Sequence, residues 1–256
     1  MELTTTRRVA NHWPWISGVV ALGVAAALGL LVMLRESPLE LDAEWMDDVL
    51  AGRTPQLEVL ALLMDRIGGG IVAIFVIPLG MVALLLIARR PWGALFSIVA
   101  AALSGATVQL LKSLFARARP EDILVVADFG SFPSGHVANA ATVATTLVLL
   151  FGLSRSRAWV WMLGIAWIIA MALSRTYLGA HWVTDTIGGA LVGIAISIIV
   201  WAPLASRLER EPRPSKNAPQ PTGAAATPLT PAEGAPTLGA NQVSRVITPA
   251  EPARTP

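Results

Sequence analysis

The chain has 256 residues, of which 54% are hydrophobic and 14% are charged, and its formal net charge is +2. Soluble domains usually carry about 25% charged residues, and here long stretches carry none, so the composition indicates an integral membrane protein. The small positive excess gives no support for a nucleic-acid partner, and the absence of cysteine excludes disulfides, a thiolate nucleophile and a cysteine metal site.

Six apolar stretches are candidates to cross a hydrocarbon layer of about 30 Å, which needs roughly 20 residues. In chain order they are about residues 15–34, 70–88, 92–115, 137–153, 158–173 and 182–202. The first follows Arg7 and Arg8, so a cleaved signal peptide is its alternative. The length of its apolar run and the lack of a small-residue cleavage site favour a retained span. The sequence therefore predicts an all-α integral membrane bundle of six helices.

The basic residues that flank these stretches predict the orientation, because cytoplasmic loops carry an excess of Lys and Arg. In a six-span arrangement eight arginines fall on one side, and an acidic cluster between residues 36 and 48 falls on the other. The eight are Arg7, Arg8, Arg89, Arg90, Arg155, Arg157, Arg207 and Arg210. Both termini are therefore predicted to be cytoplasmic.

Composition divides the chain into three parts. Residues 1–14 are predicted to be a short cytoplasmic N-terminus, and residues 15–206 to be the membrane domain. Residues 207–256 are rich in Pro, Ala and Thr without a hydrophobic period, which predicts a disordered cytoplasmic tail. Within the membrane domain, residues 57–64 are predicted to form an amphipathic helix that lies at the outer interface or leads into the second span.

The first of three polar segments closes the third span. It contains Lys112 and Arg119, which are seven positions apart, so on a helix they share a face two turns apart. Pro120 is then expected to stop that helix. Two cations on one face at the lipid boundary suit an anionic ligand. The alternative is snorkelling to the interface, which is common for basic residues at span ends.

The second polar segment, residues 132–136, directly precedes the fourth span. Its Pro and Gly form a tight turn, and Ser134 is predicted to cap the helix that follows. The free backbone N–H groups at such a helix start bind phosphate well. His136 stands beside them, where a proton donor is useful. The alternative is a capped helix start without a functional role.

The third polar segment connects the fifth and sixth spans and contains Arg175, His181 and Asp185. His181 and Asp185 are four positions apart, so on one helical turn the carboxylate can hold the imidazole and fix its tautomer. Arg175 adds a bidentate phosphate ligand. The alternative is a structural His–Asp pair that ties two spans together.

All three segments are predicted to lie on the same side of the membrane, where they supply three cations, two histidines and a carboxylate. Charges so close to a membrane are costly and usually functional. Cations and helix N–H groups stabilise the charge that spreads over a transferring phosphoryl group. One histidine can attack phosphorus while the other protonates the leaving oxygen. The structural alternatives would require three separate coincidences.

The three segments together resemble a known signature. Lys-x6-Arg-Pro, Pro-Ser-Gly-His and Ser-Arg-x5-His-x3-Asp are similar to the three-part motif of the type 2 phosphatidic acid phosphatase (PAP2) superfamily. This superfamily includes bacterial undecaprenyl pyrophosphate phosphatases and phosphatidylglycerophosphate phosphatases, and it is related to the vanadium haloperoxidases. The resemblance covers about residues 50–205 and fills every motif position.

The resemblance implies a role for each motif residue. His181 would be the nucleophile that forms a phosphohistidine, oriented by Asp185, and His136 would be the general acid. The residues implied to bind phosphate are Lys112, Arg119, Ser134, Gly135 and Arg175. The resemblance further implies six helices and an outward-facing site that needs neither a metal nor another cofactor. The lack of a clustered Asp/Glu/His metal site in the sequence agrees with this implication.

Polar residues outside the motifs receive structural interpretations. Arg117 is interpreted as snorkelling to the interface, with contact to a second phosphate as the alternative. Asp65 and Arg66 are interpreted as an interfacial ion pair, and the alternative is that they shape the substrate entrance. Gly189 and Gly193 have a GxxxG spacing, which favours close helix packing and does not by itself establish a dimer. Three further acids are interpreted as solvated loop residues: Glu121, Asp122 and Asp128.

The predicted function is hydrolysis of a lipid phosphate or pyrophosphate at the outer membrane face. Undecaprenyl pyrophosphate, phosphatidylglycerophosphate and phosphatidate all fit, because no motif records selectivity or oligomeric state. A phosphotransferase that uses the same intermediate is one alternative, and a non-catalytic lipid-phosphate binder or transporter is another. A binder has no need of the His181–Asp185 pair, and a transporter should show internal repeats or broken helices, of which the sequence shows neither.

Overall fold

The computed structural model describes residues 2–35, 37–152 and 158–211, with side chains from Trp13 onward. These residues form helices and connecting segments and contain no strand. The elements are α1 (Glu2–Met33), α2 (Glu40–Ala51), α3 (Pro55–Gly68), the π-helical segment η1 (Val72–Val76), α4 (Ile77–Ile87), α5 (Pro91–Phe115), α6 (Gly135–Phe151), α7 (Ala158–Tyr177) and α8 (Val183–Glu209).

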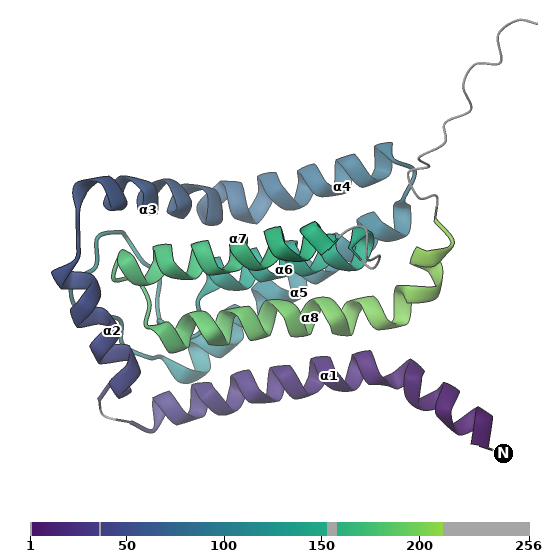
Figure 1. Cartoon of the computed structure of the whole chain (residues 1–256), viewed down its shortest axis with the longest axis horizontal. Helices are drawn as coiled ribbons and strands as arrows, with labels where there is room; N and C mark the ends of the chain where they lie inside the picture. The colour runs from purple at the N-terminus through teal and green to yellow at the C-terminus, as the bar shows by residue number, and fades with distance from the viewer. Residues whose placement is uncertain (1, 36, 153–157, 212–256) are drawn as a thin grey trace, which may run out of the picture. The chain divides into compact units, whose positions relative to one another are not determined.

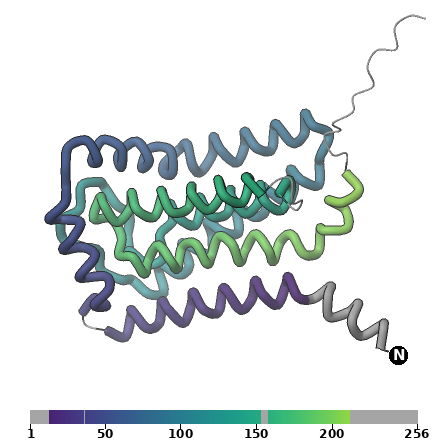
Figure 2. Tube along the Cα trace, viewed as in Figure 1, coloured from purple at the N-terminus to yellow at the C-terminus, as the bar shows by residue number. Residues whose placement is uncertain are grey.

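Helix α8 lies at the centre of the packing and contacts α1, α5 and α6. Figure 1 shows α1 along one side of this group and α3 with α4 along the other, while α2 crosses one end. The trace in Figure 2 follows the same course from α1 through α2 to α3. The largest buried apolar cluster draws on α1, α4, α5, α6 and α8, so these five helices share one core.

Four described helices are long and apolar enough to cross a membrane: α1 over Trp13–Met33, α5, α7 and α8. A fifth span results if α3 and the segment Val72–Ile87 are counted together, although this pair is bent by 43°. Helix α6 is apolar but has 17 residues. Each of the six predicted spans falls on one of these segments, so the prediction of an all-α membrane bundle is confirmed.

The second span differs in detail from its prediction, because α3 leads directly into it. Thr54 begins α3 by accepting a hydrogen bond from the backbone N–H of Leu57 at 3.4 Å, and Pro55 occupies the first turn. The helix is interrupted after Gly68, where Gly70 adopts a left-handed conformation with φ +56° that glycine tolerates best. The end of α3 contacts both α6 and α7 and so lies beside the predicted site.

Two helix ends depart from the sequence predictions. Helix α5 ends at Phe115, because Ala116 turns into the left-handed region with φ 44°. The prediction that Pro120 stops this helix was therefore wrong, and Arg119 lies in the following loop. Helix α8 continues to Glu209, beyond the predicted end at residue 202.

The residues that follow α8 pack against the start of α5. The buried carboxylate of Glu211 accepts hydrogen bonds from the backbone N–H groups of Trp92 and Gly93, at 2.5 and 3.2 Å, and pairs with Arg90 at 3.3 Å. A carboxylate at a helix N-terminus satisfies N–H groups that have no partner within the helix. Residues 207–211 are thus part of the bundle, and the rest of the predicted tail, 212–256, lies outside the described residues.

Two glycines on α8 allow it to approach α6 closely. A Cβ atom at Gly189 would lie 2.4 Å from the carbonyl oxygen of Ser134, and one at Gly193 would lie 2.3 Å from that of Ala138. Both distances are far below van der Waals contact, so any larger residue would push the helices apart. The prediction of close helix packing at these glycines is confirmed, and this packing fixes the start of α6 against α8.

Candidate active site

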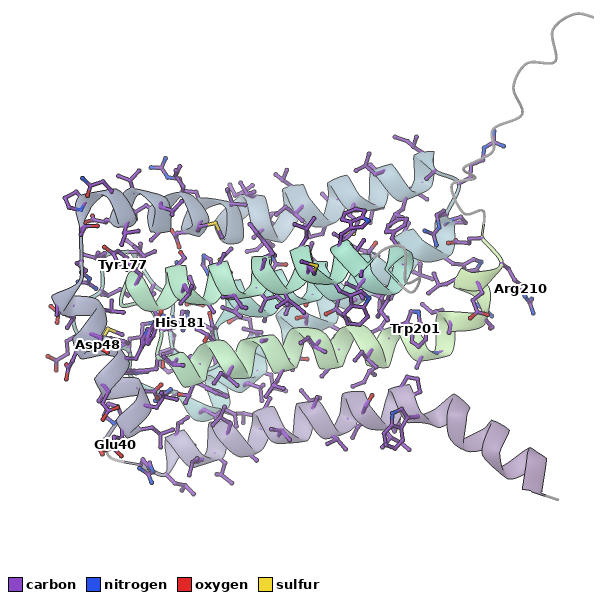
Figure 3. The ribbon with its side chains drawn as sticks, viewed as in Figure 1. Glu40, Asp48, Tyr177, His181, Trp201 and Arg210 are labelled. Atoms are coloured by element: carbon purple, nitrogen blue, oxygen red, sulfur yellow. The ribbon has the colours of Figure 1, made fainter. Side chains whose placement is uncertain are left out.

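The three polar segments of the sequence meet at one end of the bundle. They are the end of α5 with the loop after it, the start of α6, and the connection between α7 and α8. Figure 3 shows His181 near the end where α2 carries Glu40 and Asp48, whereas Arg210 lies at the opposite end. Residues as far apart in the sequence as Lys112 and Asp185 therefore converge on one region.

His181 is held in a defined orientation by its Nδ1 atom. This atom lies 2.8 Å from the carbonyl oxygen of Ser131 and 3.5 Å from Oδ2 of Asp185. A carbonyl oxygen only accepts hydrogen bonds, so Nδ1 carries the hydrogen and Nε2 presents a lone pair. Nε2 lies 3.4 Å from Nη1 of Arg119. The free lone pair of His181 is therefore directed toward a cation.

Burial sets the charge of the same histidine. The side chain of His181 is 2% exposed, and this burial lowers its pKa to about 4, although Asp185 opposes the shift. His181 is thus neutral at physiological pH, which is the form that can act as a nucleophile. The expectation of a shared helical turn with Asp185 was wrong, because α8 begins at Val183 and the carbonyl of Ser131 is the nearer partner.

Asp185 is the centre of a buried network that the sequence analysis missed. Its Oδ2 accepts the backbone N–H of Trp182 at 2.8 Å, and its Oδ1 accepts Nη1 of Arg117 at 2.5 Å. The other terminal nitrogen of Arg117 pairs with Oδ2 of Asp42 at 2.7 Å. Because the Arg117 side chain is only 7% exposed, the interpretation as a snorkelling residue was wrong.

Asp42 connects α2 to this network. Its carboxylate is fully buried and accepts hydrogen bonds from the backbone N–H of Thr184 at 2.9 Å and from the hydroxyl of Thr184 at 2.7 Å. One arginine therefore lies between two buried carboxylates. A signal that could have found Asp42 is its i, i+4 spacing from Met46, because these two residues form the buried face of α2.

Lys112 and Arg119 converge although they do not share a helix. Lys112 lies in the last turn of α5 and donates to the Asp128 carboxylate at 2.8 Å and to the carbonyl of Gly130 at 3.0 Å. Arg119, in the loop, donates to the same carboxylate at 2.7 Å and to the carbonyl of Ala180 at 2.5 Å. The predicted common helical face was wrong, but the two cations do lie around one anionic group.

That anionic group is Asp128, which lies between the two cations. Partial burial raises the pKa of Asp128, but the hydrogen bond from Lys112 and the charges of Lys112 and Arg119 outweigh burial and hold the pKa below its usual value. The carboxylate is therefore charged at neutral pH. Asp128 does lie in a loop with its side chain 58% exposed, as interpreted from the sequence, but its ion pairs with two site cations were not predicted.

The start of α6 presents unsatisfied donors to the same region. Ser134 is the N-cap residue, but its hydroxyl makes no capping hydrogen bond, contrary to the prediction. The hydroxyl is buried and has no hydrogen-bond partner among the described residues. Gly135 and His136 follow as the first two residues of α6, whose backbone N–H groups have no acceptor within a helix. These donors suit an anion placed at the end of α6.

His136 and Arg175 are joined by an acid from α3. Nε2 of His136 lies 3.1 Å from Oδ1 of Asp65, and Nη1 of Arg175 pairs with the same oxygen. The Arg175 side chain is 3% exposed, and its Nε atom has no hydrogen-bond partner among the described residues. Asp65 therefore pairs with two predicted site residues and not, as expected from the sequence, with Arg66.

A cavity of about 770 Å³ adjoins these groups. Its polar end is lined by Lys112, Asp128, His136, Arg175 and His181. Its other end runs between α5 and the η1–α4 segment and is lined by small and apolar side chains, among them Ala101, Gly105, Phe75 and Leu79. Phe75 and Leu79 are more than half exposed, so the apolar end reaches the lipid-facing surface of the helices. The cavity can hold a molecule with an anionic head and an apolar tail.

The fold and the site define a multi-pass helical membrane protein in which two histidines and two cations line one cavity, with a third cation, Arg119, next to His181. Residues 93–207 match the sequence profile of the PAP2 superfamily. The matched segment is somewhat less than half of the chain and includes every motif residue named from the sequence.

Two curated relatives and one solved structure are similar to the chain. It is 42% identical over 69 residues to an undecaprenyl-diphosphatase of Sulfolobus acidocaldarius, a stretch that covers 27% of this chain and 31% of that protein. It is 30% identical over 118 residues to phosphatidylglycerophosphatase B of Bacillus subtilis, covering 44% and 58%. These matches thus span about a third and somewhat over half of the two relatives' lengths.

The solved structure is the PAP2 type phosphatidylglycerolphosphate phosphatase from Bacillus subtilis. It superposes with a TM-score of 0.64 at 25% sequence identity and covers 77% of this chain and 98% of that chain. The helical arrangement therefore extends beyond the matched sequence segment and includes much of the chain outside residues 93–207.

Proposed function

We propose that the chain is a membrane phosphatase that hydrolyses a lipid phosphate or pyrophosphate through a phosphohistidine at His181. The observation that carries this proposal is the orientation of His181. Its Nδ1–H is held by the carbonyl of Ser131, and its Nε2 is directed toward Arg119. A neutral imidazole with a free lone pair beside cations is suited to attack an anionic phosphorus centre.

In the first step, Nε2 of His181 forms a bond to phosphorus while the bond from phosphorus to the leaving oxygen breaks. Lys112, Arg119 and Arg175 stabilise the charge on the phosphoryl oxygens, together with the Ser134 hydroxyl and the backbone N–H of Gly135. Binding of the phosphoryl group displaces the Asp128 carboxylate, which lies between two of these cations. Asp185 assists by accepting from Nδ1 of His181 as positive charge develops on the imidazole.

His136 transfers protons in both steps. In the first it protonates the leaving oxygen, so that a lipid alcohol or a lipid phosphate departs as a neutral or less charged group. In the second it takes a proton from a water molecule that attacks phosphorus, the N–P bond breaks, and inorganic phosphate is released. The same residue thus returns to its initial protonation state after one turnover.

The cavity supports a lipid as the substrate. Its polar end contains the two histidines, and its apolar end opens between α5 and η1–α4 beside exposed Phe75 and Leu79. A phosphorylated lipid can therefore keep its tail among the apolar side chains while its headgroup reaches His181. Undecaprenyl pyrophosphate, phosphatidylglycerophosphate and phosphatidate all have this form, and the relatives named above act on lipids of two of these classes according to their names.

We place both termini in the cytoplasm and the active site on the extracytoplasmic side of the cell membrane. The basic residues that predict the cytoplasmic side include Arg90 and Arg207. Arg90 pairs with Glu211, which follows α8, and Arg207 lies over the ring of Trp92 at the start of α5. This end lies opposite to the one near His181, as the positions of Arg210 and His181 in Figure 3 indicate. The positive-inside rule then directs the site outward.

We further propose that the reaction needs no metal ion or other cofactor, because the protein cations supply the charge that a metal would provide. Among residues 2–35, 37–152 and 158–211, no group of three or more His, Asp or Glu side chains could hold a metal. Purified protein in detergent micelles is therefore expected to release phosphate from at least one lipid phosphate in the presence of EDTA. The assay compares undecaprenyl pyrophosphate, phosphatidylglycerophosphate, phosphatidate and diacylglycerol pyrophosphate.

The comparison among these lipids names the preferred substrate. Release that stops with EDTA and returns with a divalent cation would contradict the metal-free mechanism. Folded protein that binds the lipids without releasing phosphate would instead support the binder, and phosphate recovered on an added alcohol acceptor would support the transferase.

Asp128→Asn is expected to lower the KM for the preferred lipid phosphate about three- to fivefold, the range of a partly exposed ion pair. The substrate phosphate then no longer competes with a charged carboxylate for Lys112 and Arg119. Steady-state kinetics in mixed micelles measure this change. Asp122→Asn, in the same loop and without an ion pair among the described residues, is the matched control. An unchanged or raised KM for Asp128→Asn would show that the carboxylate does not compete with substrate.

A further inference from the structure

We propose that Asp65 is a positioning residue for the general acid His136 and that protonation of the leaving oxygen depends on it. This inference rests on the proposed phosphatase function and adds a residue to that same site. Asp65 lies on α3, outside the segment 93–207 that matches the superfamily profile and outside all three sequence motifs. The basis for its role is therefore its place in the structure.

One carboxylate oxygen of Asp65 serves two site residues. Oδ1 lies 3.1 Å from Nε2 of His136 and pairs with Nη1 of Arg175. Because a carboxylate accepts hydrogen bonds, Nε2 of His136 carries a hydrogen. Nδ1 of His136 has no hydrogen-bond or ion-pair partner in the part of the chain that the structure describes. Nδ1 is then the nitrogen that can exchange a proton with the leaving oxygen, while Asp65 stabilises the imidazolium from the opposite side of the ring.

The end of α3 is shaped to bring Asp65 to this position. A Cβ atom at Gly69 would lie 2.1 Å from Nε2 of His136, and one at Gly68 would lie 2.3 Å from Met171. Two consecutive glycines thus let the backbone of α3 approach the imidazole and α7 more closely than other residues would allow. The contact between Asp65 and His136 therefore depends on a close approach of α3 to α6 and α7.

Helix α3 is also tied to α7, the helix that carries Arg175. The hydroxyl of Ser174 donates to the carbonyl of Ala61 at 2.9 Å. At the start of α3, the backbone N–H of Thr54 donates to the hydroxyl of Tyr177 at 2.7 Å. Both contacts lie N-terminal to Asp65 and hold this part of α3 beside α7. A carboxylate on a helix fixed in this way can keep a ring nitrogen in one orientation.

The arrangement divides the work between the two site histidines. His181 has its Nδ1 hydrogen on a backbone carbonyl, which carries no full charge, and it is neutral and nucleophilic. His136 has its Nε2 hydrogen on a carboxylate, which leaves Nδ1 as the nitrogen that can exchange a proton with the leaving oxygen. The different partners of the two rings thus match the different roles proposed for them.

Two lipids that share a tail but differ in leaving group test this inference. The leaving group of phosphatidate is the alkoxide of diacylglycerol, which needs a proton. The leaving group of diacylglycerol pyrophosphate is phosphatidate, whose phosphate oxygen departs readily without one. For Asp65→Asn, kcat/KM for phosphatidate is expected to fall about 100-fold, the typical contribution of general acid catalysis, and kcat/KM for the pyrophosphate less than tenfold. Because kcat/KM reports the steps through lipid release, later hydrolysis of the phosphohistidine does not affect the comparison.

Glu58→Gln is the matched control, since it neutralises another acid on α3 and should leave both values unchanged. Asp65→Glu keeps the charge on a longer side chain, so its kcat/KM for phosphatidate is expected to fall selectively but by less than in Asp65→Asn. An equal loss of kcat/KM with both lipids would assign Asp65 a purely structural role through Arg175. Unchanged kcat/KM with both lipids would show that Asp65 has no role in the reaction. Wild-type protein that releases phosphate from none of the four lipids assayed above would overturn the proposed function itself, which separates that failure from the failure of this inference.

Discussion

Replacing His181 with glutamine is expected to abolish phosphate release, with a loss of at least about 10⁴-fold in kcat, because removal of a nucleophile leaves only binding and charge stabilisation. Glutamine has a similar length but no lone pair that can form a stable bond to phosphorus. Rapid quench with a radiolabelled lipid phosphate should trap a phosphorylated wild-type protein and no labelled His181→Gln protein. Phosphohistidine is recognised by its loss in acid and its persistence in base.

The third histidine of the chain, His12, supplies the control for this experiment. His12→Gln removes the same chemical group at a position with no proposed role, so its activity and its labelling should equal those of wild type. Persistent labelling of His181→Gln would assign the nucleophile to another residue. Turnover without any labelled intermediate in wild type, under conditions where product forms, would favour direct attack by water.

Replacing Arg117 with methionine is expected to destabilise the protein by about 3–5 kcal/mol, the cost of leaving buried charges without a partner. Asp42 and Asp185 are both fully buried, and Arg117 lies between them at 2.7 and 2.5 Å. Without the guanidinium, two carboxylates would remain in a site from which water is excluded. Thermal unfolding in detergent should show a clear drop in the midpoint, and activity should fall as Asp185 loses its position.

Two further variants make this prediction specific. Arg117→Lys keeps the positive charge but has one nitrogen in place of two, so it cannot contact both carboxylates in the same way, and its stability should be intermediate. Arg66→Met, at an exposed position on α3, removes a charge without a buried partner and should change little. A midpoint for Arg117→Met equal to that of Arg66→Met would contradict a stabilising role for the network.

The sequence predicted the bundle well because apolar stretches of about 20 residues leave few alternatives in a membrane. It predicted helix ends less well. The end of α5 at Phe115 depends on a left-handed Ala116, and alanine gives no signal for that conformation. The sequence likewise pointed to the three segments that meet around the cavity, because each concentrates charge where charge is costly.

Pairings between charged residues were the least predictable part of the site. Asp65 could reach a neighbour in the sequence, Arg66, yet it contacts Arg175, which is 110 residues away. Arg117 similarly contacts Asp42, at a separation of 75 residues. Such partners are chosen by how helices pack, and a single sequence carries no direct record of that packing. The positions of charges near the membrane were informative, whereas their local neighbours were misleading.

The short length of α6 has a consequence for the depth at which the reaction takes place. Its 17 residues span about 26 Å at 1.5 Å per residue, somewhat less than a hydrocarbon layer of about 30 Å. With the far end of α6 at the cytoplasmic boundary, Ser134 and His136 lie about 4 Å inside the outer edge of the hydrocarbon layer, just below the ester and phosphate groups of the outer leaflet. A lipid then need not be lifted out of its leaflet for its phosphate to meet His181. The headgroup therefore need not rise toward water, and the tail area exposed to water during catalysis stays small.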